Sequence, residues 1–177
     1  MFSVYSFLQY FLADIIQVSG AAQKTAFLLG LGLVLGMPAS IVGGYLADRC
    51  GRKILIYVSG SLMMLCSGAY TIVSQYPSWS ITIMIAAVFA IANAIYSSVD
   101  WAMAVDVLPN RSDAAKDMGI WHAAIVLPQM LSPAITGLML SGLKHISLRL
   151  GYTIVFGVIT LWFSAGTALV RNIRTVK

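Results

Sequence analysis

Long runs of apolar residues, separated by short polar breaks, extend over almost the whole chain. A helix that crosses a lipid bilayer needs about 20 mostly apolar residues. Stretches that meet this requirement lie at about 2–18, 25–47, 54–74, 79–105, 115–143 and 150–170. None of the breaks between them could hold a soluble domain. The pattern predicts one all-α membrane domain, residues 1–177, with six transmembrane helices.

The first of these stretches is short and carries Asp14. Small residues follow it at Ser19–Ala22, as they do at the cleavage site of a secretory signal peptide. However, Met1–Phe11 contains no Lys or Arg, so the basic segment that opens a signal peptide is missing. We therefore expect a membrane span here.

The composition agrees with a membrane protein, because 59% of the residues are hydrophobic and only 10% are charged. Soluble domains are about 45–50% apolar and about 25% charged. Every acidic residue is Asp, and the net charge is +5. The basic residues lie between apolar runs, which indicates membrane topology and argues against nucleic-acid binding. Cys50 and Cys66 do not form a CxxC or metal-ligand spacing.

The distribution of basic residues predicts the orientation of the chain in the membrane. The breaks on one side of the membrane hold only Lys24, Lys144 and Arg149. Cytoplasmic loops carry the excess of Lys and Arg. We therefore expect both termini to be cytoplasmic, in a plasma (inner) membrane. The richer side holds Arg49, Arg52, Lys53, Arg111, Lys116, Arg171, Arg174 and Lys177.

The break after the second stretch is the most informative segment, and it reads Gly44-Tyr-Leu-Ala-Asp-Arg-Cys-Gly-Arg-Lys53. Gly51 can adopt a positive φ at no steric cost, as a tight turn requires. Gly44 permits close approach of another helix. Asp48 can pair with Arg49 or Arg52, or lie at a helix N-terminus.

This string resembles the signature loop G-x-L-A-D-R-x-G-R-K of the major facilitator superfamily. In that family the loop joins the second and third helices of each half and acts as a conformational latch. The resemblance implies that Asp48 and Arg52 hold a cytoplasmic gate in one state. It assigns Gly44, Arg49, Gly51 and Lys53 to the same gating loop.

Further segments are similar to the tenth and eleventh helices of bacterial carriers of this family, including glycoside- and sucrose-type cation symporters. They are Val99–Pro109, Ala114–Trp121 and Leu127–Gln129. The resemblance implies the C-terminal six-helix half of a twelve-helix fold. A second six-helix half, either an N-terminal half or another copy, is then an expected partner. Because the chain starts almost inside a helix, we expect a truncated or split gene product.

Polar residues recur on one face of the first, fourth and fifth stretches. Polar side chains at membrane depth usually face a cavity or another helix. In the family, helices at these positions line the central cavity, so the resemblance agrees with the pattern. The residues are Ser3, Ser6, Tyr10, Asp14 and Gln17, then Asn93, Ser97 and Asp100, then His122, Gln129 and Thr136, with Ser132 beside them.

Several of these residues allow two interpretations. Asp14 is either a cavity residue or a solvated residue near the outer membrane face. Asp100 and Asp106 are candidate ion-pair partners for the gate arginines, and Asp100 is also a candidate proton carrier. His122 could titrate near neutral pH or act as a hydrogen-bonding residue between helices. Tyr10, Asn93, Ser97 and Gln129 are candidate substrate or cavity residues, although Asn93 and Gln129 also suit interhelical hydrogen bonds.

Small residues and prolines within the stretches point to packing and bending. Gly32 and Gly36 form a GxxxG pair, for which close helix packing is the first interpretation and dimerisation the second. Pro38, Pro128 and Pro133 each remove a backbone donor inside a span. The fifth stretch, which holds the last two, is a predicted kinked gating helix.

The sequence predicts transport of a small polar solute, for which a sugar is one candidate. Transport would proceed by alternating access with H⁺ or Na⁺ coupling. The alternative is an interaction protein, or an inactive half-carrier, that keeps the fold without transporting. An enzyme is not expected, because the chain has no HExxH or GxSxG motif. No cofactor is expected either.

Overall fold

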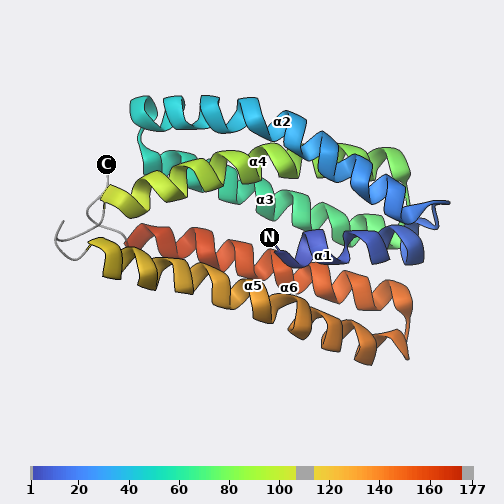
Figure 1. The fold of residues 1–177 in the computed structure, drawn as a ribbon. Helices are drawn as coiled ribbons and strands as arrows, with labels where there is room; N and C mark the ends of the chain where they lie inside the picture. Colours follow the sequence, from blue (N-terminus) through green and yellow to red (C-terminus); the bar gives the residue numbers. More distant parts are fainter. Residues whose placement is uncertain (1, 107–113, 173–177) are drawn as a thin grey trace.

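The computed structural model of the chain describes residues 2–106 and 114–172, which are almost entirely helical (Figure 1). The short breaks of the sequence become tight connections. In chain order the elements are α1 (Phe2–Phe11), the π-helix η1 (Leu12–Ile16), α2 (Ala21–Cys50), α3 (Arg52–Gln75), α4 (Trp79–Asp106), α5 (Ala114–Lys144), α6 (Leu148–Leu169) and the 3₁₀ turn η3 (Val170–Asn172).

The predicted spans are confirmed for α2 to α6, which are long and apolar enough to cross a membrane. The first stretch differs from the prediction of a full span at 2–18. Its apolar helical segment covers Val4–Ile16 and is shorter than the other five. At 1.5 Å per residue, a segment of that length spans about 20 Å, less than the hydrocarbon thickness of about 30 Å. The N-terminal end of α1 lies midway along the bundle (Figure 1).

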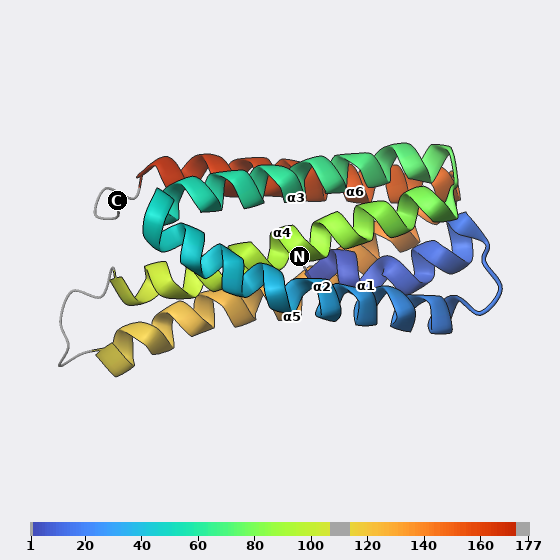
Figure 2. The ribbon, with the colours of Figure 1, turned by 90° about the horizontal axis from the view of Figure 1, so that it is seen from above.

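The helices form a bundle with two sides. Helices α3 and α6 pack against each other on one side, while α2 and α5 lie on the other (Figure 2). Helix α4 packs against both α2 and α3, and α1 lies between α2 and α5. Helices α1, α2, α4 and α5 thus lie on the side of the bundle away from the α3–α6 pair, and we call this side the open face (Figure 2).

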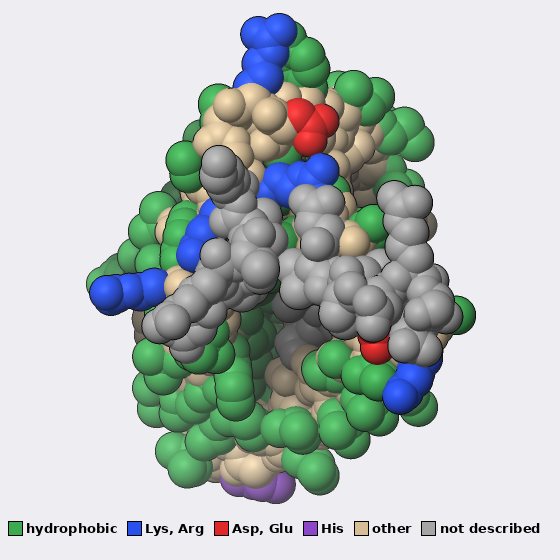
Figure 3. Space-filling model, turned by 90° about the vertical axis from the view of Figure 1, so that its left-hand side faces the viewer, with side chains coloured by type: hydrophobic (Ala, Val, Ile, Leu, Met, Phe, Trp, Pro, Cys, Tyr) green, Lys and Arg blue, Asp and Glu red, His purple; other side chains and the backbone are tan. Residues whose placement is uncertain are grey.

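The connections alternate between the two ends of the bundle, as the span count predicts. The α2–α3 turn and the C-terminal end of α6 lie at one end (Figure 1). The α1–α2, α3–α4 and α5–α6 connections lie at the other end. At the first end, Lys and Arg side chains lie around a face whose flanks are hydrophobic (Figure 3). The prediction of this charged side also used Arg111, Arg174 and Lys177, which lie outside the described residues.

Helices α2 and α4 approach closely along a line of glycines. A Cβ added at Gly32 would lie 3.2 Å from the Ala90 Cβ, and one at Gly36 would lie 3.4 Å from the Ala94 Cβ. At Gly43 it would lie 3.1 Å from two side-chain carbons of Ile95. The predicted close packing at the GxxxG pair is thus confirmed, and the partner is α4 of the same chain.

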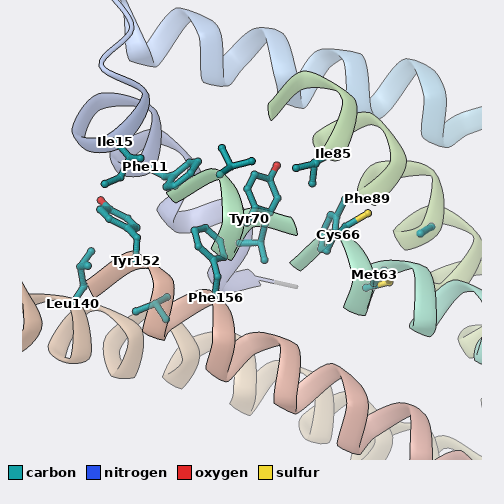
Figure 4. Packing of buried hydrophobic residues seen from close by; sticks show 14 residues of the cluster. Phe11, Ile15, Met63, Cys66, Tyr70, Ile85, Phe89, Leu140, Tyr152 and Phe156 are labelled. Carbon is teal, nitrogen blue, oxygen red and sulfur yellow. The ribbon is translucent and has the colours of Figure 1, made fainter. Parts of the chain in front are cut away.

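An aromatic cluster fills the centre of the bundle. Phe11 of α1, Tyr70 of α3, and Tyr152 and Phe156 of α6 point toward one another (Figure 4). The Phe11 ring meets the other three edge-on at centroid distances of 5.2 to 5.7 Å, and Tyr70 stacks on Phe156 at 5.0 Å. These edge-to-face contacts add to the stabilisation from apolar burial. They fix α1 to α3 and α6 despite the shortness of α1.

Hydroxyl groups join α3 to α6. The Thr153 Oγ1 atom is 2.5 Å from the Ser74 Oγ atom and accepts a hydrogen bond of 2.8 Å from the Gln75 side-chain amide. The Thr160 Oγ1 atom donates a 2.8 Å hydrogen bond to the Phe156 carbonyl of its own helix. The contact between α3 and α6 therefore includes polar groups as well as apolar side chains.

We expect Thr153→Val to destabilise the bundle by about 1 kcal/mol, since an interhelical hydrogen bond in a membrane protein contributes about 0.6 to 1.7 kcal/mol. Thr160→Val is the matched control, because its lost bond lies within one helix. Unfolding in mixed detergent micelles, followed by circular dichroism, measures the difference. Equal stability of the two variants would contradict the assigned role of Thr153.

The outer surface is strongly apolar at positions that face away from the bundle. Large exposed apolar patches are rare on soluble monomers. A lipid environment removes the cost of exposing them, so the chain is an integral membrane protein. The most exposed large side chains include Val34 at 69%, Ile41 at 74%, Leu138 at 75% and Trp162 at 74%.

Candidate functional site

The α2–α3 connection consists of one non-helical residue, Gly51, with φ 96° and ψ 133°. The predicted positive φ of Gly51 is confirmed, and the Gly51 N–H donates a 3.0 Å hydrogen bond to the Ala47 carbonyl. Asp48 and Cys50, expected in a loop, belong instead to the last turn of α2. The helix continues through them because Gly51 alone provides the reversal of direction.

The basic residues that begin α3 contact the ends of two other helices. The Arg52 Nη1 atom donates a 2.7 Å hydrogen bond to the Ala102 carbonyl near the C-terminus of α4. The Lys53 Nζ atom donates a 3.3 Å hydrogen bond to the Arg171 carbonyl in η3. A cation is unfavourable at the N-terminus of its own helix and favourable at the C-terminus of another. These contacts therefore tie the α3 terminus to α4 and to the end of α6.

Arg52 also connects α3 to the preceding helix. Its Nη2 atom lies 3.5 Å from the Asp48 carboxylate, whose side chain is 72% exposed, whereas that of Arg52 is 24% exposed. An exposed ion pair contributes little stability, so the Ala102 contact is the stronger one. The Arg49 guanidinium lies over the Tyr45 ring, 4.5 Å from its centroid. Of the two arginines, Arg52 is the one that points into the bundle.

The predicted gate partners lie on α4 beside this contact. Asp100 is half-buried two residues before Ala102 and has no salt bridge among the described residues. Asp106 ends α4, and its side chain is outside the described part of the chain. Pairing of either carboxylate with Arg49 or Arg52 therefore stays a prediction.

A cavity of about 520 Å³ lies between α1, α2 and α4, with Tyr70 of α3 also lining it. Its wall from α2 runs over Leu28–Ser40, and its wall from α4 runs over Ala86–Ala94. Most of the lining side chains are Leu, Ala, Phe and Met. The close α2–α4 contact at the glycines forms one edge of the cavity, and α1 forms the other.

Asn93 is the principal polar residue of this cavity. Its Nδ2 atom donates a 3.3 Å hydrogen bond to the Tyr5 hydroxyl, which joins α4 to α1. Its Oδ1 atom is buried and has no hydrogen-bond partner among the described residues. The Ser40 hydroxyl, by contrast, bonds the Met37 carbonyl at 2.8 Å. The structure thus brings the predicted cavity residue Asn93 together with Tyr5, which the sequence pattern did not single out.

The other predicted cavity residues do not line this space. Ser97 is half-buried on α4, and its neighbour Ser98 contacts α2 through a 3.1 Å hydrogen bond to the Ser40 carbonyl. On α5, His122 is exposed and Gln129 is half-buried. Pro128 and Pro133 lie inside α5, as expected for the fifth stretch.

Of the polar stripe expected from Ser3 to Gln17, Tyr10 and Asp14 lie on one side and line one hollow, whereas Gln17 has left the helix. The π-helix η1 takes more residues per turn than an α-helix, so positions after Phe11 are rotated relative to those before it. Tyr10 is 59% exposed, and Gln17 has left the helix with φ 55°. Asp14 is turned toward α5 and α6. A π-turn within an α-helix is frequent at functional sites.

Asp14 forms a cluster at the end of the bundle opposite the Gly51 turn. The Asp14 Oδ2 atom accepts a 2.7 Å hydrogen bond from the Tyr152 hydroxyl and lies 3.5 Å from the Lys144 Nζ atom. These partners come from α6 and α5, so the carboxylate joins three elements. Tyr10 and Asp14 also line a hollow of about 160 Å³ between α1 and α5. The interpretation of Asp14 as merely solvated is therefore incomplete.

We expect Tyr152→Phe to destabilise the chain by about 1.5 to 3 kcal/mol, the usual contribution of a hydrogen bond to a charged group. Tyr10→Phe is the control, because the exposed Tyr10 hydroxyl has no hydrogen-bond partner among the described residues. Thermal unfolding of both variants in detergent tests this expectation. A Tyr152→Phe protein as stable as Tyr10→Phe would contradict it.

The sites define a class of membrane protein. The bundle has a one-residue turn flanked by basic residues at one end, the Asp14 cluster at the other and a cavity between its helices, with no candidate metal cluster among the described residues. Secondary transporters are built from helical bundles of this kind.

The comparison with family models agrees, since the model of the Major Facilitator Superfamily matches residues 1–176. The chain belongs to the Major Facilitator Superfamily. Membership implies secondary transport and not enzymatic activity. Comparisons with curated proteins and with solved structures gave no significant match.

Proposed function

We propose that the chain supplies one wall of a solute site, and that the cavity between α1, α2 and α4 is that wall. The supporting observation is a space of about 520 Å³ that is lined by Asn93 among mostly apolar side chains. Transporter sites lie near the middle of the bilayer, between elements that move relative to each other. The solute is a small organic molecule with polar groups.

The charged contacts at the two ends are the proposed gates. Arg52 joins α3 to α4 at one end, and Asp14 joins η1 to α5 and α6 at the other. In alternating access, one end opens while the other stays closed. Asp14 and Asp100 are the proposed carboxylates for H⁺ or Na⁺ coupling, because each lies on an element that borders the open face.

The open face formed by α1, α2, α4 and α5 is proposed to receive a second six-helix half. On this proposal the chain corresponds to the C-terminal half of a twelve-helix carrier, as the likeness of its fourth and fifth helices to such carriers suggests. The end of the bundle that contains Gly51 carries the excess of Lys and Arg. On this proposal it faces the cytoplasm, and the chain lies in the plasma membrane.

Uptake into sealed proteoliposomes tests the proposal. The vesicles contain either the chain alone or the chain with a supplied N-terminal six-helix half, and a panel of radiolabelled organic solutes is offered with and without an H⁺ or Na⁺ gradient. We expect gradient-dependent uptake when both halves are present. Absence of uptake in both preparations, with correctly inserted protein, would favour the non-transporting alternative.

A further inference from the structure

We infer that the cavity between α1, α2 and α4 binds apolar solutes that carry a hydrogen-bond acceptor, such as a carbonyl oxygen, and that the hydroxyl groups of Tyr70 and Tyr5 donate to this acceptor. The inference rests on the proposed solute site and names the chemistry of its ligand. It depends on two features of the described residues, which are the unused phenolic donors and the apolar character of the remaining wall.

Tyr70 carries a buried hydroxyl group that has no partner. Its side chain is 1% exposed, and its ring is held by the edge-to-face contact with Phe11 and by stacking on Phe156. The hydroxyl points away from Phe156 (Figure 4) and has no hydrogen bond to any of the described residues. Because buried polar groups normally have a hydrogen-bond partner, this hydroxyl indicates a missing acceptor.

The Tyr70 hydroxyl can be reached from the cavity, whereas the unpaired oxygen of Asn93 cannot. Among the described residues, the Asn93 Oδ1 atom is the side-chain atom that is both fully enclosed and without a partner. The Tyr70 hydroxyl also has no partner there but is not enclosed in this way, and Tyr70 lines the cavity. A solute in the cavity can therefore accept a hydrogen bond from Tyr70.

Tyr5 supplies a second phenolic donor to the same space. Its hydroxyl oxygen accepts the 3.3 Å hydrogen bond from the Asn93 Nδ2 atom, and its own hydrogen has no acceptor among the described residues. The Tyr5 ring meets the Phe89 ring edge-on at a centroid distance of 5.8 Å, which holds it against α4. The Ser40 hydroxyl, by contrast, already donates to the Met37 carbonyl.

The rest of the wall offers few groups for a strongly polar ligand. Leu8, Leu29, Leu33 and Phe89 are typical of the side chains around the space. A sugar carries a hydroxyl on nearly every carbon atom, and each hydroxyl buried without a partner lowers affinity. A ketone with an aromatic or aliphatic body needs only donors, and its body removes apolar surface from water. The ligand class is therefore an apolar carbonyl compound, and a sugar is the weaker fit.

The test uses 1-indanone and indane, which share a bicyclic body without donors and differ in the carbonyl acceptor. Binding of each tritiated probe to the chain and to Tyr70→Phe in nanodiscs is measured by equilibrium dialysis, with empty nanodiscs subtracted. We expect Tyr70→Phe to weaken binding of 1-indanone by about three- to tenfold, as for loss of one neutral hydrogen bond, and to leave indane unchanged. D-glucose should not displace 1-indanone.

Further variants locate the effect. Tyr70→Phe keeps the ring, and because the lost hydroxyl has no partner among the described residues, the variant should be at least as stable as the parent chain. Tyr5→Phe should also weaken 1-indanone and leave indane unchanged. Tyr10→Phe is the matched control, because Tyr10 is exposed and lines a different hollow, and it should bind both probes normally. Circular dichroism and gel filtration confirm that each variant is folded.

Equal affinity of 1-indanone for the parent chain and for Tyr70→Phe would overturn the inference. An equal loss for indane, displacement of 1-indanone by D-glucose or absence of 1-indanone binding would also overturn it. The transport proposal is judged separately by vesicle uptake. Binding that depends on Tyr70 without any uptake would leave the inference standing and refute transport, whereas sugar uptake without such binding would do the reverse.

Discussion

Replacement of Gly43 by Leu is expected to separate α2 from α4 and to destabilise the chain by about 3 kcal/mol, the upper part of the usual range for overpacking. A Cβ at this position would already lie 3.1 Å from the Ile95 Cγ1 and Cγ2 atoms and 3.2 Å from the Ile95 Cα atom. The backbone of α4 must therefore move, because rotation of a side chain does not relieve the contact with Cα. Unfolding in mixed micelles gives the free-energy difference.

Gly30→Leu is the matched control for this substitution. It lies on the same helix, and a Cβ there would meet no atom within 4 Å. Replacing glycine in a helix by a better helix former stabilises it by about 0.5 to 1 kcal/mol, so Gly30→Leu should be neutral or slightly stabilising. If Gly43→Leu were as stable as Gly30→Leu, the close α2–α4 contact would be wrong.

Replacement of Arg52 by Ala is expected to reduce uptake about tenfold in vesicles that contain the chain and a supplied N-terminal half. The lost hydrogen bond to the Ala102 carbonyl is charge-assisted, and such bonds contribute about 1.5 to 3 kcal/mol. A change of that size in the balance between two gate states alters their populations by at least about tenfold. Initial rates of solute uptake measure the effect.

Two substitutions distinguish the geometry of Arg52 from its charge. Arg49→Ala removes a neighbouring guanidinium that lies over the Tyr45 ring, and the variant should retain most of the uptake. Arg52→Lys keeps the charge but loses the planar fork that serves Asp48 and Ala102 together, so uptake should stay low. Full activity in Arg52→Ala would remove Arg52 from the proposed gate.

The sequence pattern predicted most of the fold because hydrophobic runs and glycines act locally. The apolar runs placed helices α2 to α6, and the positive φ of Gly51 followed from the needs of a tight turn. The pairing of Gly32 and Gly36 with another helix was also predictable. Which helix they meet was not, because any small-residue stripe suits several partners.

The site contacts were less predictable, since they join residues far apart in the sequence. Tyr5 and Asn93 are 88 positions apart, and Asp14 and Tyr152 are 138 apart. Neither tyrosine stands in a polar motif that would distinguish it from packing residues. The π-helix at Leu12–Ile16 also has no clear signal in the pattern.

The single-residue connection at Gly51 limits how α2 and α3 can move. Without a loop to lengthen or shorten, the adjoining ends of the two helices keep a nearly fixed separation. A displacement of the C-terminal end of α2 therefore also displaces the start of α3, where Arg52 contacts the Ala102 carbonyl. On the proposal that α2 forms part of the solute wall and Arg52 part of a gate, the length of this turn couples the position of the wall to the state of the gate.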